Sequence, residues 1–126
     1  MYKSKYFTNK ALSCPCCGDM KMQESTLIKL DLLCEKLGVP VLLSSAYRCL
    51  RHNTNVGGAK HSAHMEGYAV DIPCHGVKAY NILEAAFAVR FTGIEVQQMS
   101  MLAIHKRWIH LDDAPATLVR QRPYLF

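Results

Sequence analysis

The clearest structural signal in the sequence lies in residues 62–73, SAHMEGYAVDIP. Gly67 permits a sharp chain reversal, because glycine adopts backbone angles that other residues avoid. The next residues, YAVDI, read as a strand, and Pro73 ends it because proline donates no backbone hydrogen bond. The turn between His64 and Asp71 can therefore bring both side chains to one site.

Two amphipathic helices are expected, one on each side of this stretch. Over residues 23–37, apolar side chains recur at three- and four-residue steps, which is the helical period, at Leu27, Ile28, Leu30, Leu33, Cys34 and Leu37. Gly38 and Pro40 stop this helix, because glycine accepts a left-handed end and proline cannot extend the ladder. The second helix is expected over residues 77–90, with an apolar face formed by Ile82, Leu83, Ala86, Phe87 and Val89.

Short strands complete the expected fold. Residues 41–46 read as a buried strand, whereas residues 51–65 have neither a helical nor a strand period and are expected to form a long functional loop. Residues 93–96, 101–105 and 107–111 read as a meander of three strands. The pattern predicts an α+β fold, a small antiparallel sheet with helices packed on it.

The size and charge of the chain limit its organisation and its partners. Its 126 residues suit a single domain, 1–126, in which residues 1–18 form a cysteine-containing N-terminal segment. The start has no apolar core of a secretory signal, and no apolar stretch approaches the roughly 20 residues of a membrane span. We therefore expect a soluble protein without membrane insertion, made in the cytoplasm. The formal charge of +5 is spread without a basic stripe, which argues against nucleic acid and suits an anionic cell-wall polymer.

The six cysteines leave three interpretations open. Cys14 and Cys17 form a Cys-x-x-Cys pair that could bind a structural zinc with two further thiols from Cys34, Cys49 and Cys74. Disulfides are the second possibility, although an even count without a secretory signal does not establish them. The third is a set of buried or free thiols that behave as small hydrophobic side chains.

The residues that carry chemistry are two histidines and an aspartate. A catalytic zinc needs about three protein ligands and an open position for water, and nitrogen and oxygen donors suit it. His64, Asp71 and His110 can supply such a set. In the last strand, the two-residue period puts Trp108, His110 and Asp112 on one face, opposite the inward-pointing apolar residues.

An ordered series of motifs resembles the zinc D-Ala-D-Ala carboxypeptidase family of metallopeptidases. The match runs from about Leu37 to Asp112, and its core, Ser-x-His-x-x-Gly-x-Ala-x-Asp, combines two ligands, a turn glycine and a small strand residue. The motifs are Ser45-Ala46-Tyr47-Arg48, Asn53, Val56-Gly57-Gly58-Ala59, Ser62 to Asp71 and Trp108-Ile109-His110-Leu111-Asp112. The resemblance implies the fold of these peptidases, which the hedgehog signalling domain shares.

The resemblance also implies roles for individual residues. His64, Asp71 and His110 would bind one catalytic zinc ion, and Arg48 would contact the substrate near the reacting carbonyl. An arginine there can stabilise the developing oxyanion, a contribution of about 3 kcal/mol to the barrier. Ser62 would either bind the substrate or brace the loop that carries His64.

The resemblance leaves open which residue is the base that accepts the proton of the attacking water. Many relatives have Glu or Asp three residues before the last histidine, but this chain has Arg107, which cannot act as a base. His105 could serve if the chain bends between it and the metal, and Glu66 is a further candidate. Asp112 is expected to orient a metal ligand without binding the metal itself.

The function expected from these features is zinc-dependent hydrolysis of peptide bonds in peptidoglycan stem peptides, by a D-Ala-D-Ala carboxypeptidase or a murein endopeptidase. A phage or prophage lysis protein that acts at the cell wall would fit the missing secretory signal. The alternative is a zinc-containing module of the same fold that only binds peptide or protein, for which Arg107 is the best argument. A redox protein built on Cys14 and Cys17 lacks the expected strand and helix context, and the oligomeric state stays open.

Overall fold

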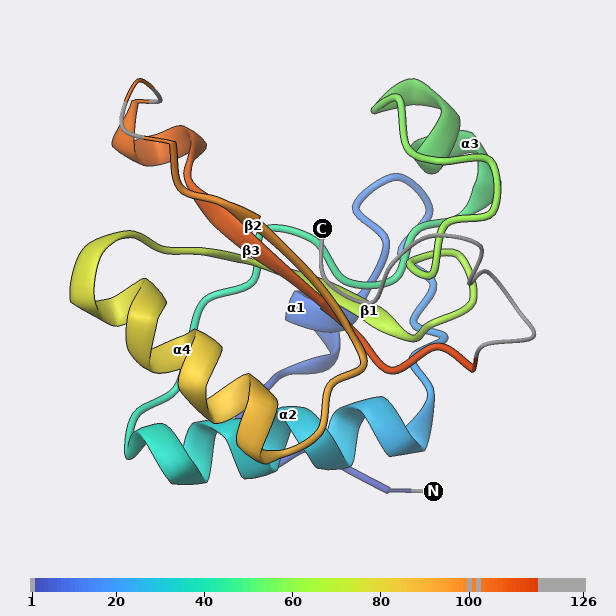
Figure 1. Cartoon of the computed structure of the whole chain (residues 1–126). Coiled ribbons are helices and arrows are strands. Elements are labelled where there is room, and N and C mark those ends of the chain that lie inside the picture. Colours follow the sequence, from blue (N-terminus) through green and yellow to red (C-terminus); the bar gives the residue numbers. More distant parts are fainter. Residues whose placement is uncertain (1, 100, 102, 116–126) are drawn as a thin grey trace.

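The computed structural model describes residues 2–99, 101 and 103–115. In these residues four α-helices, one 3-10 helix and three strands occur (Figure 1). Their bounds are α1 Asn9–Leu12, α2 Glu24–Leu37, α3 Leu50–Asn55, β1 Ala69–Pro73, α4 Gly76–Ala88, β2 Gly93–Gln97, η1 Ile104–Lys106 and β3 Trp108–Asp112. None of the helices in this part of the chain is long and apolar enough to cross a bilayer.

The three strands form one antiparallel sheet in the order β1-β3-β2. The last strand of the chain is therefore the central one, and the predicted meander is wrong in its middle member. In place of a strand over 101–105, the described residues there contain the 3-10 helix η1. The predicted α+β class with an antiparallel sheet is confirmed.

The sheet separates a core face from a polar face. Val70, Ile72, Ile94, Ile109 and Leu111 are all buried and belong to the main hydrophobic core. Because side chains alternate along a strand, the residues between them point to the other face. Helices α2 and α4 pack against each other on the core side of the sheet (Figure 1). The polar face is the one that carries the site described below.

The two long helices agree closely with their sequence patterns. Helix α2 ends at Gly38, which is left-handed with φ 75° and donates its N–H back to Cys34. Within the two predicted apolar faces, Ile28 and Phe87 are exposed, at 37% and 54%. Those two positions lie at the edges of the helical stripes, so the sequence pattern made both faces too broad.

Two connecting segments differ from expectation. The segment 41–46 is not a strand, and it meets β1 through a single antiparallel bridge between Ser45 and Asp71. The segment 51–65 is not wholly irregular, because α3 occupies its start, where Cys49 caps the helix by accepting the His52 N–H. Helix α3 has an almost wholly polar sequence, LRHNTN, so no apolar period revealed it.

Candidate metal centre

His64 is presented by a tight turn that its neighbours hold in place. The buried Ser62 hydroxyl accepts the His64 backbone N–H at 3.2 Å, which is the contact expected of a residue that braces the loop. His64 Nδ1 lies 2.7 Å from the carbonyl oxygen of Ala46. Because a carbonyl only accepts, Nδ1 carries the hydrogen, and Nε2 is left with its lone pair directed into the site.

The close of this turn requires glycine at position 67. Gly67 has φ +79°, and a Cβ there would lie 2.0 Å from the carbonyl oxygen of Lys21. Gln23 fixes the same contact, since its backbone N–H donates to the Gly67 carbonyl at 2.9 Å and its side chain donates to the Glu66 carbonyl. The turn that carries His64 is therefore clamped against the segment that precedes α2.

Asp71 lies in the middle of β1, and its backbone is bound to the segment that carries Ser44 and Ser45. Its N–H donates to Ser45 O at 2.8 Å, and its carbonyl accepts the Ser44 N–H at 2.9 Å. The carboxylate oxygen Oδ1 is 3.2 Å from His64 Nε2 and 3.0 Å from His110 Nδ1. Burial alone would raise the pKa of Asp71, but these two histidines outweigh burial and hold the pKa well below its usual range.

His110 is oriented by a carboxylate on its far side. Its Nε2 lies 2.8 Å from Asp112 Oδ2, and Asp112 is fully buried. The register pairs Asp112 with Gly93, where a Cβ would lie 2.3 and 2.4 Å from the two carboxylate oxygens, so a side chain at 93 would displace that carboxylate. Burial lowers the pKa of His110, yet the neighbouring carboxylates of Asp112 and Asp71 favour its charged form and raise the pKa overall.

The three converging atoms suit a metal ion. With Nε2–H of His110 directed to Asp112, the site receives a lone pair from Nδ1 of His110, one from Nε2 of His64 and an anionic oxygen of Asp71. Three acceptors that face one another repel unless a cation lies between them. In a tetrahedral zinc site with nitrogen and oxygen ligands, neighbouring donor atoms lie about 3.3 Å apart, close to the observed 3.2 and 3.0 Å to Asp71. The three residues therefore fit a zinc ion.

Arg48 contacts the candidate ligand Asp71, and its guanidinium is held at three points. Its Nη2 donates to Asp71 Oδ2 at 3.1 Å, Nε to Ser45 Oγ at 2.9 Å and Nη1 to Asn53 Oδ1 at 3.3 Å. A Cβ on Gly58 would lie 2.1 Å from Asn53 Oδ1, so the bare backbone at this position makes room for the Asn53 amide. The guanidinium fixes the ligand carboxylate and keeps further N–H groups for another acceptor.

The remaining sequence candidates lie outside the cluster. His105 is exposed on η1 and lines a surface hollow together with residues 73–78. Glu66 is exposed in the His64 turn. Neither side chain joins the three converging ligand atoms, so the base predicted from sequence has no support in their placement.

Sequence reasoning missed Glu95. The register pairs Glu95 of β2 with His110, as it pairs Asp71 with His110 from the other side. Paired residues of an antiparallel sheet lie on the same face with Cβ atoms about 5 Å apart. Glu95 is half-buried, and its carboxylate accepts a hydrogen bond from Gln97 Nε2 at 2.8 Å. The only sequence signal was its position between the apolar Ile94 and Val96, in the two-residue period of a strand.

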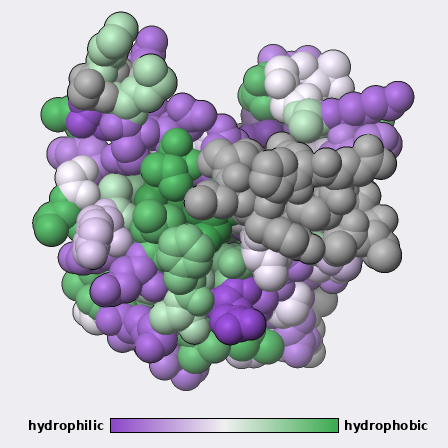
Figure 2. All heavy atoms as spheres, viewed as in Figure 1, coloured by the Kyte–Doolittle hydropathy of each residue, from purple (hydrophilic) through white to green (hydrophobic). Residues whose placement is uncertain are grey.

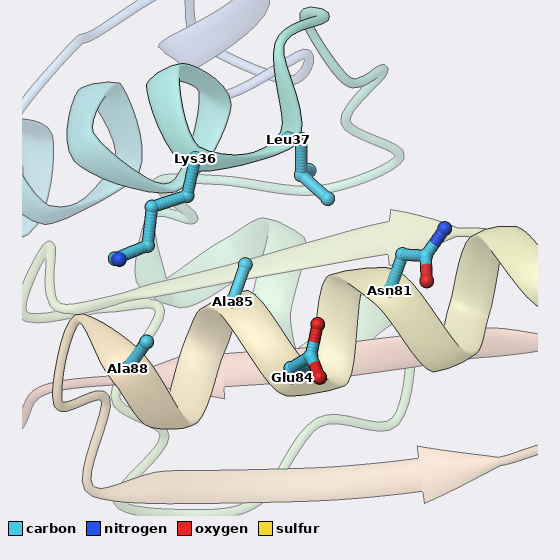
Figure 3. A pocket seen from close by; sticks show the side chains of 6 residues that line it. All are labelled: Lys36, Leu37, Asn81, Glu84, Ala85 and Ala88. Carbon is cyan, nitrogen blue, oxygen red and sulfur yellow. The ribbon is translucent and has the colours of Figure 1, made fainter.

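The cluster face of the sheet is turned away from α2 and α4. Figure 2 shows the surface hollowed between two projections, one formed by the end of the β2–β3 pair with η1 and the other by α3. A separate hollow between α2 and α4 belongs to the opposite side of the sheet (Figure 3). Its lining contains none of the candidate ligands and comprises Lys36, Leu37, Asn81, Glu84, Ala85 and Ala88.

Comparison with known proteins agrees with this arrangement. The family model described as peptidase M15 matches residues 5–112, which include the three candidate ligands and Arg48. No curated protein matches the chain.

Proposed function

Because the chain belongs to the M15 family of metallopeptidases, we propose that it hydrolyses peptide bonds in the stem peptides of bacterial peptidoglycan. The reaction would either remove a terminal D-alanine or cut an internal link of the stem. The place of action in this proposal is the cell wall, reached when a phage or prophage protein is released or carried there. Membership of this family makes the chain a metallopeptidase that acts on a peptide.

One observation carries the proposal: the convergence of His64 Nε2, His110 Nδ1 and Asp71 Oδ1 on one point. A zinc ion held there would polarise the carbonyl of the substrate and lower the pKa of a bound water molecule to about 7. The groups around this position orient the two histidines. Asp112 keeps the His110 ring in the tautomer that presents Nδ1, and Ala46 does the same for Nε2 of His64.

We assign Arg48 to the carbonyl oxygen of the substrate, which gains negative charge, and Glu95 to the proton that the attacking water loses. The guanidinium of Arg48 would donate to the carbonyl oxygen as it gains negative charge. The carboxylate of Glu95, on the same sheet face as His110, would hold the proton that the attacking water gives up and pass it to the leaving amine. Glu95 takes the role that Arg107 cannot fill.

The test compares three variants for zinc content and for cleavage of purified stem peptides. His110→Ala should lose one zinc ion relative to the wild type and all cleavage. Glu95→Gln should keep the zinc and lower kcat by about 100- to 10,000-fold. Glu84→Gln, an exposed glutamate on α4, is the matched control and should change neither. Full activity of Glu95→Gln would remove Glu95 from the mechanism, and zinc content that does not depend on His110 would overturn the proposal.

A binding module of the same fold is the second candidate, favoured by Arg107 at the position where many relatives carry an acid. In that case zinc would still depend on His110, but no stem peptide would be cleaved. Binding of the intact peptides, measured by calorimetry, together with no turnover by the wild type, would identify this function and contradict the peptidase.

A further inference from the structure

Three thiols outside the peptidase site lie together at the N-terminal end of the fold. The sulfur atoms of Cys14, Cys17 and Cys49 all lie within 4.8 Å of one another. The sulfur atoms of Cys14 and Cys49 are 3.6 Å apart. Cys34 and Cys74 are buried elsewhere in the core, and none of the six cysteines forms a disulfide.

A tight turn presents two of the three thiols to the third. The Gly18 N–H donates to the Cys14 carbonyl and the Cys14 N–H donates to the Asp19 carbonyl, both at 2.8 Å. Gly18 closes this turn with φ +79°. Cys14 and Cys17 are thereby brought to the same side, where Cys49 meets them from the start of α3.

Backbone N–H groups point at these sulfurs. The Cys49 N–H lies 3.5 Å from Cys14 Sγ, and the His52 N–H lies 3.4 Å from Cys49 Sγ. Hydrogen-bond donors around a sulfur favour its thiolate form, which is the form that binds a metal. Cys16, in contrast, does not belong to the group, although it lies in the same turn.

We propose that Cys14, Cys17 and Cys49 bind a second zinc ion through three thiolates. In a tetrahedral site with zinc to sulfur distances of about 2.3 Å, neighbouring sulfurs lie about 3.8 Å apart, close to the 3.6 Å between Cys14 and Cys49. Each thiol would release its proton to solvent on binding, and a water molecule beside the exposed Cys17 would complete the four ligands. A disulfide would use only two of the three sulfurs and leave the third without a role.

The proposed ion ties the N-terminal turn to the segment that carries Arg48. Cys49 follows Arg48 directly. Tyr47, the residue before Arg48, donates its N–H to the Leu12 carbonyl at 3.3 Å. The ion would thus be structural, and it would be chemically distinct from the nitrogen and oxygen site of His64, Asp71 and His110 because its donors are all sulfur.

The test separates the two sites by their ligand chemistry. Protein purified under reducing conditions should contain two zinc ions per chain, Cys17→Ser one and His110→Ala one. Cobalt added to metal-free His110→Ala should give the near-ultraviolet charge-transfer absorption of cobalt thiolates, and the double variant with Cys17→Ser should not. Cys16→Ser is the matched control, because Cys16 lies in the same turn and is exposed like Cys17. It should keep both ions, because Cys16 is not one of the three clustered thiols.

Three results would overturn the proposal. The first is a cobalt complex of His110→Ala that lacks thiolate absorption. The second is loss of an ion in Cys16→Ser, which would contradict the three-thiolate set. The third is a mass two hydrogens lower than expected for the purified chain, with Cys14 linked to Cys49, because a disulfide there consumes two of the three ligands. Should His110→Ala fail to fold, the fall from two ions to one in Cys17→Ser carries the test alone.

Discussion

Replacement of Asp112 by asparagine tests the geometry of the metal centre most directly. One oxygen of Asp112 accepts from His110 Nε2 at 2.8 Å and the other accepts the Ala114 N–H at 3.2 Å. Asparagine keeps the shape but has one acceptor and one NH₂ group. Whichever way its amide turns, the NH₂ faces an N–H donor, and either His110 or the Ala114 backbone loses its partner. Water cannot compensate, because Asp112 is fully buried.

The expected size of the effect follows from the role of such partners. Loss of a carboxylate that orients a ligand histidine typically weakens metal binding by about 10- to 100-fold. In free energy this is about 1.4 to 2.7 kcal/mol. The assay is competition with a chromophoric zinc chelator at fixed pH, read for the ion whose binding depends on His110. Peptide cleavage at saturating zinc, measured beside it, separates lost metal from lost chemistry.

Gly93→Ala provides an independent check that leaves the carboxylate in the chain. Its methyl group would lie 2.3 Å from an Asp112 oxygen and must push it away. The double variant, Gly93→Ala with Asp112→Asn, should lose less zinc-binding free energy than the sum of the losses in the two single variants, because both changes act on one contact. Zinc affinity of Asp112→Asn within about twofold of the wild type would refute the tautomer assignment of His110 and with it the metal geometry.

Three further outcomes are expected. Zinc affinity should fall as pH falls through the raised pKa of His110, because protons compete with the metal for the ligand nitrogen, and titration between pH 5 and 9 would check this. Metal-free protein should show the opposite trend in chemical denaturation. The raised pKa adds stability that is complete below the unfolded histidine pKa of about 6.5 and is lost as pH rises through the folded value. Gly58→Ala should displace Arg48, because its Cβ would lie 2.1 Å from Asn53 Oδ1 and 3.0 Å from Arg48 Nη1. Kinetic assays should then give a kcat lower by up to about 100-fold with unchanged zinc content, and an unchanged kcat would contradict the role of Arg48.

The elements with a strong period or a clear stop were predictable from sequence. Helix α2 combines a helical apolar stripe with a glycine end, and β1 lies between a turn glycine and a proline. The three candidate ligands could also be identified from the sequence, because His64, Asp71 and His110 belong to local motifs. That they meet in space follows from the pairing of Asp71 with His110, which no local pattern contains.

The features that sequence reasoning missed depend on contacts between distant segments. Glu95 became a candidate only once the register set it opposite His110. His105, chosen because it is near in sequence, lies on η1, whose turn leads its side chain to another hollow. The thiol group could not be chosen among several cysteines, because only the folded chain brings Cys49 to the N-terminal turn.

The strict alternation in β3 ties folding and chemistry to the same five residues. Ile109 and Leu111 supply the core, while His110 and Asp112 supply the metal centre. A slip of one residue would exchange the two sets, burying charged groups among the helices and exposing the core. A single-residue insertion or deletion in this strand would therefore damage stability and activity together, whereas a substitution can spare one of them. In this protein the length of the last strand is under tighter constraint than its composition.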